Sequence, residues 1–570
     1  MKILSRIERR RLEDVVASAR ESAETAARKA LHTLGVDEAD PPAHLSADER
    51  VLRRRLQAQA RQLGDREARA GKGHWSIEQL VEKVAYDRLH RMLFARFLAE
   101  NNLLFSQQHG VPVSLQDCEE LAPEMGLCNG WEAAAAFAAQ MLPEIFRADD
   151  PAGLLTLPPE DEGAMRQLVI QVPGEVFLAD DSLGWVYQFW QTRRKDEVNG
   201  SGRKIGADEL PAVTQLFTED YMVLFLLHNT LGAWWTARHG GTDLTFDYLR
   251  TMEDGTPAAG GFEAWPATAR ELKVLDPCMG SGHFLVFALP LLAEFRQAEE
   301  GLSEKDAFDA VLRDNLFGLE LDPRCTQLAV FNLALAAWKR GGYRRLPQMN
   351  LACCGLGIHA TRDDWMKLAN GDRHLADGMG RLHDLFQQAP TLGSLIDPRK
   401  VGKDDLFVSG WHDLQPLLAA ALTKEKTRSD DELAEMGVTA QGLARAAEIL
   451  TGRFNLVATN VPYLGRGKQS DTLKDFCEKT YPEAKADLAT CFVERCLSLC
   501  DKGGTSALVT PQNWLFLGSY RKLRGRLLED VQWDSVTRLG PHAFETIGGE
   551  VVNVVLLTLD QQKPKTDHQF

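Results

Sequence analysis

The order of apolar and polar positions divides the chain into two parts. Up to about residue 209, apolar residues recur at helical spacing with charged residues between them, as in the stretch 75–105. From about residue 210 to residue 560, short apolar runs alternate with helical patterns. This alternation is typical of buried parallel strands joined by helical crossovers.

Seven apolar runs are predicted to be the strands of one sheet. They are Leu272–Leu275, Leu316–Glu320, Asn350–Cys354, Leu456–Thr459, Thr505–Thr510, Ser535–Leu539 and Val551–Thr558. The last two runs are expected to form a hairpin-like edge. The predicted fold class is α/β, with a doubly wound, mainly parallel, Rossmann-like sheet preceded by an all-α N-terminal region.

The expected domains are a helical region at 1–209, a sheet domain at 210–560 and a polar tail at 561–570. The sheet domain carries a helical insert at about 355–453, with helical patches such as Leu382–Gln388 and Trp411–Leu422. The insert is longer than an ordinary crossover and suggests a lid or a partner surface. The charged, glycine-containing segment Arg193–Gly206 is predicted to be a loop.

Composition places the chain among globular proteins without membrane spans. It has 570 residues, of which 44% are hydrophobic and 26% charged, and a formal net charge of −16. The first ten residues have no apolar core of a signal peptide, and no apolar stretch is long enough to span a membrane. The ten cysteines have no zinc-ligand spacing. We therefore expect a cytoplasmic protein with free thiols and no metal site.

A glycine loop follows the first predicted strand. Asp276-Pro277 ends the strand, Gly280 and Gly282 form a tight turn, and Phe284 begins a helical pattern that extends to Glu299. Glycines allow the backbone to approach a ligand closely. The loop lacks the spacing of a dinucleotide fingerprint and the lysine of a P-loop. A nucleoside with little or no phosphate is the ligand that fits this pattern best.

A second strand ends in acidic residues after a short charged connection. Glu320 stands where an acid can accept hydrogen bonds from both ribose hydroxyls of a nucleoside. Asp322 precedes Pro323 and can instead cap the next helix. Before the glycine loop, Phe217-Thr218 opens an apolar helical pattern, and a plain helix cap is the simple reading of that pair.

The four residues Asn460-Val461-Pro462-Tyr463 close an apolar run that predicts a buried strand. The amide oxygen of Asn460 and the carbonyl of Val461 can each accept a hydrogen bond from an exocyclic amino group. The ring of Tyr463 can stack on the base that carries this group. The pattern suits a planar, amine-bearing substrate.

Together these motifs resemble S-adenosylmethionine-dependent DNA adenine-N6 methyltransferases in the gamma arrangement, of the Eco57I type. Longer runs such as Leu183–Phe189 and Asn229–Trp235 resemble the adenine methyltransferases of bacterial phage-defence systems, the PglX type of BREX and the DISARM methylase. Val461 departs from the usual Asn-Pro-Pro-Tyr motif. The resemblance implies S-adenosylmethionine as cofactor and catalytic roles for Asn460, Val461, Pro462 and Tyr463. It implies that the cofactor is held by Phe217, Thr218, Asp276, Pro277, Gly280, Gly282, Glu320 and Asp322.

The implied substrate is double-stranded DNA with a flipped adenine. The net charge argues against binding DNA over the whole surface, so a basic strip after Tyr463 is the expected contact, with Arg466, Lys468 and Lys474. A short tail after the last strand leads us to expect that a partner, such as another defence-system subunit, or a further C-terminal segment reads the target sequence. The alternatives are a methyltransferase acting on a protein glutamine or an RNA amine, and a non-catalytic DNA-binding subunit.

Overall fold

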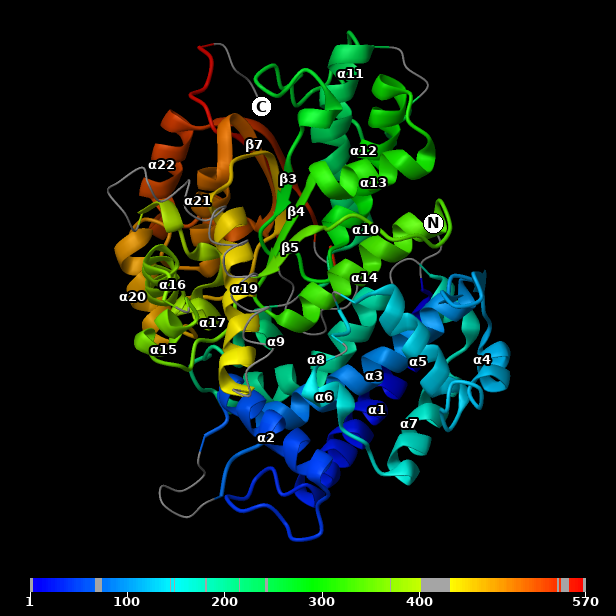
Figure 1. Cartoon of the computed structure of the whole chain (residues 1–570). Coiled ribbons are helices and arrows are strands. Elements are labelled where there is room, and N and C mark those ends of the chain that lie inside the picture. The colour runs from blue at the N-terminus through cyan, green and yellow to red at the C-terminus, as the bar shows by residue number, and fades with distance from the viewer. Residues whose placement is uncertain are drawn as a thin grey trace.

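The computed structural model describes residues 4–66, 74–143, 145–147, 149–179, 182–214, 216–240, 244–369, 371–400, 431–540, 543–544 and 553–566. Figure 1 shows a helical N-terminal region below a domain built around a sheet. Within these ranges, no helix combines the length and apolar character needed to cross a membrane.

The N-terminal region is helical, as the sequence predicts. Serine N-caps with a glutamate three residues later begin α1 and α2, so their first backbone N–H groups are satisfied. A two-stranded ribbon, β1 (Phe105–Ser106) with β2 (Val111–Pro112), is the part that helical periodicity did not predict. The helices are α1 (Arg6–Thr33), α2 (Ala47–Gln62), α3 (Glu78–Glu100), α4 (Leu115–Leu121), α5 (Gly130–Met141), α6 (Pro151–Leu154), α7 (Pro159–Gln171), α8 (Ser182–Ser201) and α9 (Leu210–Thr214).

The predicted loop Arg193–Gly206 is wrong over most of its length, because α8 continues to Ser201. Arg193 forms ion pairs with Glu197, one helical turn further on, and with Glu21 of α1. These contacts and the packing of α8 on α1 extend the helix through a charged stretch. The chain leaves the helix at Gly202, whose φ is +65°.

The sheet of seven strands has the order β5-β4-β3-β6-β7-β9-β8. Neighbours from β5 to β7 pair in parallel, whereas β9 pairs antiparallel with both β7 and β8. The fold is therefore α/β with a mainly parallel mixed sheet and a helical N-terminal region. The strands are β3 (Val274–Asp276), β4 (Leu316–Glu320), β5 (Asn350–Cys353), β6 (Phe454–Asn460), β7 (Cys500–Pro511), β8 (Gln532–Arg538) and β9 (Val554–Asp560).

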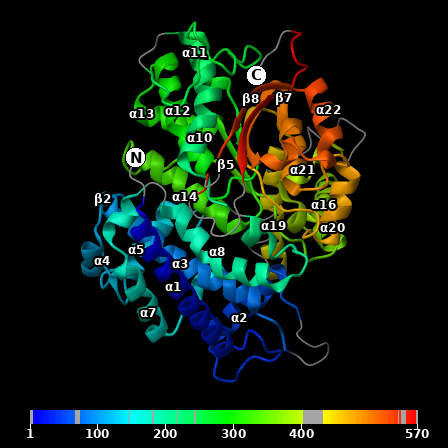
Figure 2. The same cartoon turned by 180° about the vertical axis from the view of Figure 1, so that it is seen from behind.

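Strands β3 to β7 and β9 each contribute to two separate cores. In β6, Leu456 and Ala458 belong to one buried cluster and Val457 to the other, as alternation along a strand requires. Figures 1 and 2 show α10, α12, α13 and α14 on one side of the sheet and α19, α21 and α22 on the other. The helices of this domain are α10 (Asp220–Leu227), α11 (Ala233–His239), α12 (His283–Glu300), α13 (Glu304–Asp314), α14 (Pro323–Lys339), α15 (Arg362–Lys367), α16 (Arg373–Phe386), α17 (Ala389–Leu392), α19 (Asp431–Thr451), α20 (Asp471–Thr480), α21 (Leu488–Leu499) and α22 (Arg521–Asp530).

Two details of the predicted domain differ in the structure. The short charged connection after Glu299 contains a helix, α13, which buries Phe308 and Val311 between its charged residues. The last part of the predicted insert, α19, contacts β4 and β5 and is the crossover helix to β6. The predicted helical patch Trp411–Leu422 and residues 551–552 of the last predicted strand lie outside the described residues.

Candidate active site

A pocket lies at the carboxyl ends of β3, β4 and β6, with about 990 Å³ of empty space that is partly open to solvent. This position, outside the ends of parallel strands, is where α/β folds bind ligands. Eight of the predicted site residues line it: Phe217, Thr218, Asp276, Pro277, Gly280, Glu320, Asn460 and Pro462. The lining residues do not include four others: Gly282, Asp322, Val461 and Tyr463.

The turn after β3 uses its two glycines for different purposes. Gly280 has a φ of +53°, and its N–H donates to Oε2 of Glu320 at 2.7 Å. Gly282 has a φ of +83°, and a Cβ there would lie 3.0 Å from the Cβ of Ala329 on α14. Gly282 therefore allows α12 and α14 to pack closely, and its role in holding the cofactor stays a prediction.

Glu320 is held by the backbone at the end of β4. Its Oε2 accepts from Gly280, and its Oε1 accepts from the N–H groups of Leu321 at 2.7 Å and Asp322 at 3.0 Å. A carboxylate has about four acceptor positions, so roughly one remains for a ligand. The sequence-based role needs two ribose hydroxyls, and this geometry leaves room for one.

Two carboxyl groups line the pocket, Asp276 buried and Glu320 partly buried. Burial raises the pKa of Glu320 to about 7, against the effect of its three backbone hydrogen bonds. Burial likewise raises the pKa of Asp276 to about 7, and the charge of Glu320 adds to this shift. The Oδ1 atom of Asp276 accepts from the N–H of Cys278 at 3.1 Å. Both acids therefore change charge near neutral pH.

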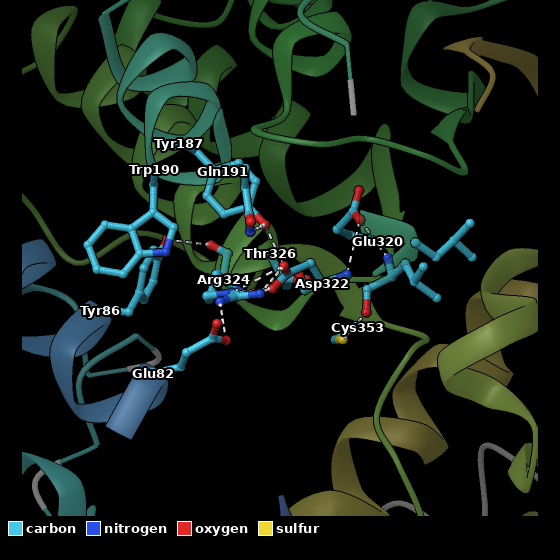
Figure 3. Close-up of polar contacts among 12 residues, drawn as sticks. Glu82, Tyr86, Tyr187, Trp190, Gln191, Glu320, Asp322, Arg324, Thr326 and Cys353 are labelled. Carbon is cyan, nitrogen blue, oxygen red and sulfur yellow. Dashed lines mark hydrogen bonds and ion pairs between the residues drawn. The ribbon is translucent and has the colours of Figure 1, made fainter. Parts of the chain in front are cut away.

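Asp322 serves the protein rather than the pocket. Its side chain caps α14 by accepting from the N–H of Arg324, and it also binds the Arg324 guanidinium at 2.8 Å. The hydroxyl of Tyr187 on α8 donates to the same carboxylate (Figure 3). Although burial opposes it, the Arg324 charge holds the pKa of Asp322 below its usual range. The helix-cap alternative is confirmed by this geometry.

Arg324 connects the end of β4 to the N-terminal helices. Its guanidinium lies 3.3 Å from Glu82 on α3, and its backbone carbonyl accepts from the hydroxyl of Tyr86 at 3.2 Å. Gln191 on α8 donates to Tyr187 at 2.7 Å, which extends the network (Figure 3). The helical region thereby supports the strand end that carries Glu320.

Thr218 joins the predicted cofactor segment to the predicted catalytic strand. Its buried hydroxyl accepts from Nδ2 of Asn460 at 3.1 Å, across 242 residues of sequence. The ring of Phe217 lies 4.6 Å from that of His283, at the start of α12. A Cβ at Gly184 would collide with Phe217, so this glycine makes the seat for the ring. The pair is thus more than a plain helix cap.

Asn460 is oriented from both ends of its amide. While Nδ2 donates to Thr218, Oδ1 accepts from the hydroxyl of Tyr463 at 2.9 Å. Burial raises the pKa of Tyr463, and the nearby charge of Asp487 adds to this shift. The N–H of Val461 donates to Val509 of β7 at 3.3 Å. The amide oxygen of Asn460 has a second lone pair for another donor.

The predicted basic strip after Tyr463 is partly neutralised. Arg466 and Lys485 both bind Glu478, at 2.7 and 2.6 Å. Lys468 is exposed, and its carbonyl accepts from the N–H of Ile205 at 2.8 Å. Lys474 is half-buried. The strip therefore offers less free positive charge than its sequence indicates.

Further lining residues come from segments without a sequence motif. The end of α17 and the turn after it contribute Thr391–Leu395, so the predicted insert forms one wall of the pocket. Leu488 and Phe492 of α21 form another part. No local pattern marks these residues, because only the tertiary fold brings them to the pocket. Among the described residues, no group of three or more His, Cys, Asp or Glu side chains could hold a metal ion.

Comparison with known proteins agrees with the motifs. Residues 314–544 match the Eco57I restriction-modification methylase family. The chain is 28% identical over 580 residues to adenine-specific methyltransferase PglX of Lacticaseibacillus casei (strain Zhang), covering 91% of this chain and 46% of that relative. It is 31% identical over 446 residues to adenine-specific methyltransferase BrxX of Escherichia coli O9:H4 (strain HS), covering 72% and 36%.

The chain thus spans less than half the length of these curated relatives. Among solved structures, the DrdV–DNA complex is similar with a TM-score of 0.45 and 12% identity, over 99% of this chain and 43% of that chain. The sequence matches confirm the resemblance drawn from the motifs. The chain is thus similar to the PglX and BrxX adenine-specific methyltransferases, and its residues 314–544 are similar to the Eco57I restriction-modification methylases.

Proposed function

We propose that the chain is an S-adenosylmethionine-dependent DNA methyltransferase that modifies adenine N6 and marks host DNA in a phage-defence system. The observation that carries this proposal is the shared pocket. The glycine loop and Glu320, on the cofactor side, line the same cavity as Asn460 and Pro462, and Thr218 bonds directly to Asn460. The adenine-specific methyltransferase relatives support the choice of base.

The residues of the pocket fit a nucleoside cofactor with a cationic amino acid part. Oε2 of Glu320 retains an acceptor position that suits one ribose hydroxyl. Phe217 and Thr218 stand beside the path from the glycine loop to Asn460 and would contact the methionine part. Asp276 and Pro277 shape the turn on which the cofactor would rest. When bound, S-adenosylmethionine supplies an electrophilic methyl group.

The acceptor side positions the amine. The bond from Asn460 to Thr218 holds the amide oxygen away from Thr218, so the oxygen can accept from N6–H of an extruded adenine. The carbonyl of Val461 would accept the second N–H, and the ring of Tyr463 would turn to stack on the base. Pro462 keeps the chain extended between them. Transfer of this kind depends on positioning more than on a strong base.

The doubly wound arrangement, a cofactor domain at 210–560 and DNA contacts by Arg466, Lys468 and Lys474 belong to the same proposal. Other defence-system subunits are its proposed partners. A methyltransferase for a protein glutamine would use the same amide hydrogen bonds, but the adenine-specific relatives favour an adenine acceptor.

The test uses labelled S-adenosylmethionine with duplex DNA, single-stranded RNA and a glutamine-containing protein extract as acceptors. We expect label in DNA only, released as N6-methyladenine on digestion. Label in RNA or in protein would contradict DNA as the substrate and identify that acceptor instead. Cofactor binding by calorimetry without label in any acceptor would favour the non-catalytic DNA-binding subunit.

A further inference from the structure

Two large apolar side chains stand exposed beside the candidate active site. Phe516 and Leu517 are 58% and 50% exposed, and Gly518 and Ser519 after them are exposed as well. Single exposed apolar residues are common, but an adjacent pair at the tip of a connection is a candidate contact surface. We call residues Gln512–Tyr520 the β7 loop.

The β7 loop begins at the carboxyl end of β7, on the side of the sheet where the Asn460–Tyr463 motif follows β6. β6 and β7 are parallel neighbours, and Asn460 is opposite Val509, so both strands end on the same side. Asp487 provides a second link. Beyond the effect of burial, its charge raises the pKa values of both Tyr463 and Tyr520, and its carboxylate accepts from the N–H of Leu464 at 3.3 Å. The β7 loop is therefore part of the rim around the catalytic motif.

Positive charge surrounds this apolar tip. The helix after the loop begins with Arg521 and Lys522, which are both exposed. The guanidinium of Arg538 lies 5.0 Å from the centre of the Phe516 ring. These cations occur in a chain whose formal net charge is −16. A cationic rim around apolar side chains is the pattern expected of a surface that meets a polyanion.

The tip has a rigid base. The side chain of Arg524 donates to the carbonyls of Trp514 and Leu517, both at 2.7 Å. Trp514 is buried and donates to Oγ1 of Thr510 at 3.1 Å. Because these hydrogen bonds fix both ends of the turn, Phe516 and Leu517 can pack against a partner without a rearrangement of the loop.

We infer that duplex DNA docks on the β7 loop, the start of α22 and Arg538, and that Phe516 and Leu517 enter the base stack as the adenine is extruded. This inference rests on the proposed function and names the surface that delivers its substrate. Arg521, Lys522 and Arg538 would contact phosphates, which position the duplex. Apolar side chains that wedge between base steps offset the unstacking that extrusion requires.

The first experiment measures duplex binding without relying on methyl transfer. Fluorescence anisotropy with a mixed-sequence duplex over a range of salt compares the full chain with R521A/K522A. Losing two phosphate contacts should weaken binding and reduce the salt slope by about two. K502A/K563A is the matched control, because it removes the same charge at the opposite end of the strands. Lys502 lies near the start of β7, and Lys563 follows the end of the antiparallel strand β9.

Equal affinities and slopes for the two double variants would overturn the docking surface. They would leave a protein partner as the occupant of the exposed pair, whatever the result for methyl transfer. Circular dichroism and thermal unfolding show whether each variant remains folded.

The second experiment tests the wedge. F516A/L517A and the matched control Leu528→Ala, an exposed leucine on α22, are compared on duplexes in which the target adenine is either paired or mismatched. A mismatched adenine is already easier to extrude. The ratio of paired to mismatched transfer rates should fall on the order of tenfold in the double variant and stay unchanged in the control.

An unchanged ratio in F516A/L517A would overturn the wedge role while the methyltransferase proposal stands. If the unmodified chain transferred no methyl group to either duplex, the proposed function would fail, and the anisotropy experiment would still decide whether DNA docks here.

Discussion

The carboxyl ends of β4 and β6 flank β3, and they hold their polar groups in different ways. At β4, Glu320 receives three backbone hydrogen bonds and Asp322 is bound by Arg324 and Tyr187. At β6, the amide of Asn460 is held by two side chains, Thr218 at 3.1 Å and Tyr463 at 2.9 Å, and by a longer 3.5 Å bond to the carbonyl of Leu216. The first arrangement is fixed before a ligand arrives. The second can exchange a partner, which the proposed binding of an extruded base would require.

The source of support also differs between the two ends. The end of β4 is held by α3 and α8 through Tyr86, Tyr187 and Arg324, in the network of Figure 3. The end of β6 instead lies beside the β7 loop, whose tip at Phe516 and Leu517 is exposed, and before the segment that carries the exposed Lys468. The N-terminal helices therefore support the β4 end, whereas the β6 end lies closer to exposed side chains.

Removing the amide at β6 is expected to have the largest effect on the reaction. Asn460→Ala deletes an acceptor for the reacting amine and should lower transfer on the order of 10²-fold or more. Cofactor affinity, measured by calorimetry, should change little, because Glu320 and the glycine loop are held by backbone hydrogen bonds that do not involve Asn460. Methylation close to that of the unmodified chain would remove Asn460 from the catalytic role.

Thr218 provides the control for orientation. Thr218→Ser keeps the hydroxyl that accepts from Nδ2, whereas Thr218→Val removes it at similar size. A loss of transfer in the valine variant alone would assign the effect to the hydrogen bond with Asn460.

Gly282→Val is expected to act on folding rather than on the pocket. The left-handed backbone and the contact with Ala329 should together lower the free energy of unfolding by on the order of 3 kcal/mol. Gly301→Val is the matched control, because Gly301 has a φ of +68° but nothing within 4 Å of its Cβ position. Thermal unfolding compares the two. Unchanged stability with lost cofactor affinity in Gly282→Val would support the view that this glycine leaves room for the ligand.

Features carried by local sequence were predictable. β4 has its predicted bounds because an apolar run stops at an acid and a proline. The tight turn at Gly280 and Gly282, between β3 and α12, follows from two residues that tolerate positive φ. The alternation of apolar runs and helical patterns was sufficient for the mainly parallel sheet, and the motifs were sufficient for the family resemblance.

Features carried by tertiary contacts were not predictable. Nothing in the sequence joins Thr218 to Asn460 or Arg324 to Glu82, because these pairs are 242 residues apart along the chain. Helix α13 was missed although Phe308 and Val311 have helical spacing, since charged residues dominate that stretch. The glycine of Arg193–Gly206 suggested a loop, but ion pairs and packing on α1 extend α8.

Cofactor affinity should depend on pH through the β4 end. Burial raises the pKa of Glu320 to about 7, so the carboxyl gains its charge as pH rises through neutrality. An ionised carboxylate accepts a ribose hydroxyl better than a protonated one, so affinity should rise about tenfold between about pH 6 and 8 and then level off. Calorimetric titration across this range measures the profile.

The matched variants separate the two acids that line the pocket. Glu320→Gln should remove most of the pH dependence, and Asp276→Asn should leave the part that belongs to Glu320. A profile that falls with rising pH would contradict the role of an ionised Glu320.

The smallest effect is expected for Val461→Pro, which restores the familiar motif at β6. The carbonyl that would accept N6–H remains, and Asn460 already has the extended backbone that a following proline favours. The variant loses the 3.3 Å hydrogen bond from Val461 to Val509, which should cost about 1 kcal/mol of stability. Transfer should stay within about threefold, since positioning by Asn460 and Tyr463 is unchanged. Val461→Ala keeps the N–H and controls for the loss of side-chain packing. An inactive but folded proline variant would show that the β6 end has diverged from Asn-Pro-Pro-Tyr geometry and needs this ladder bond to place the base.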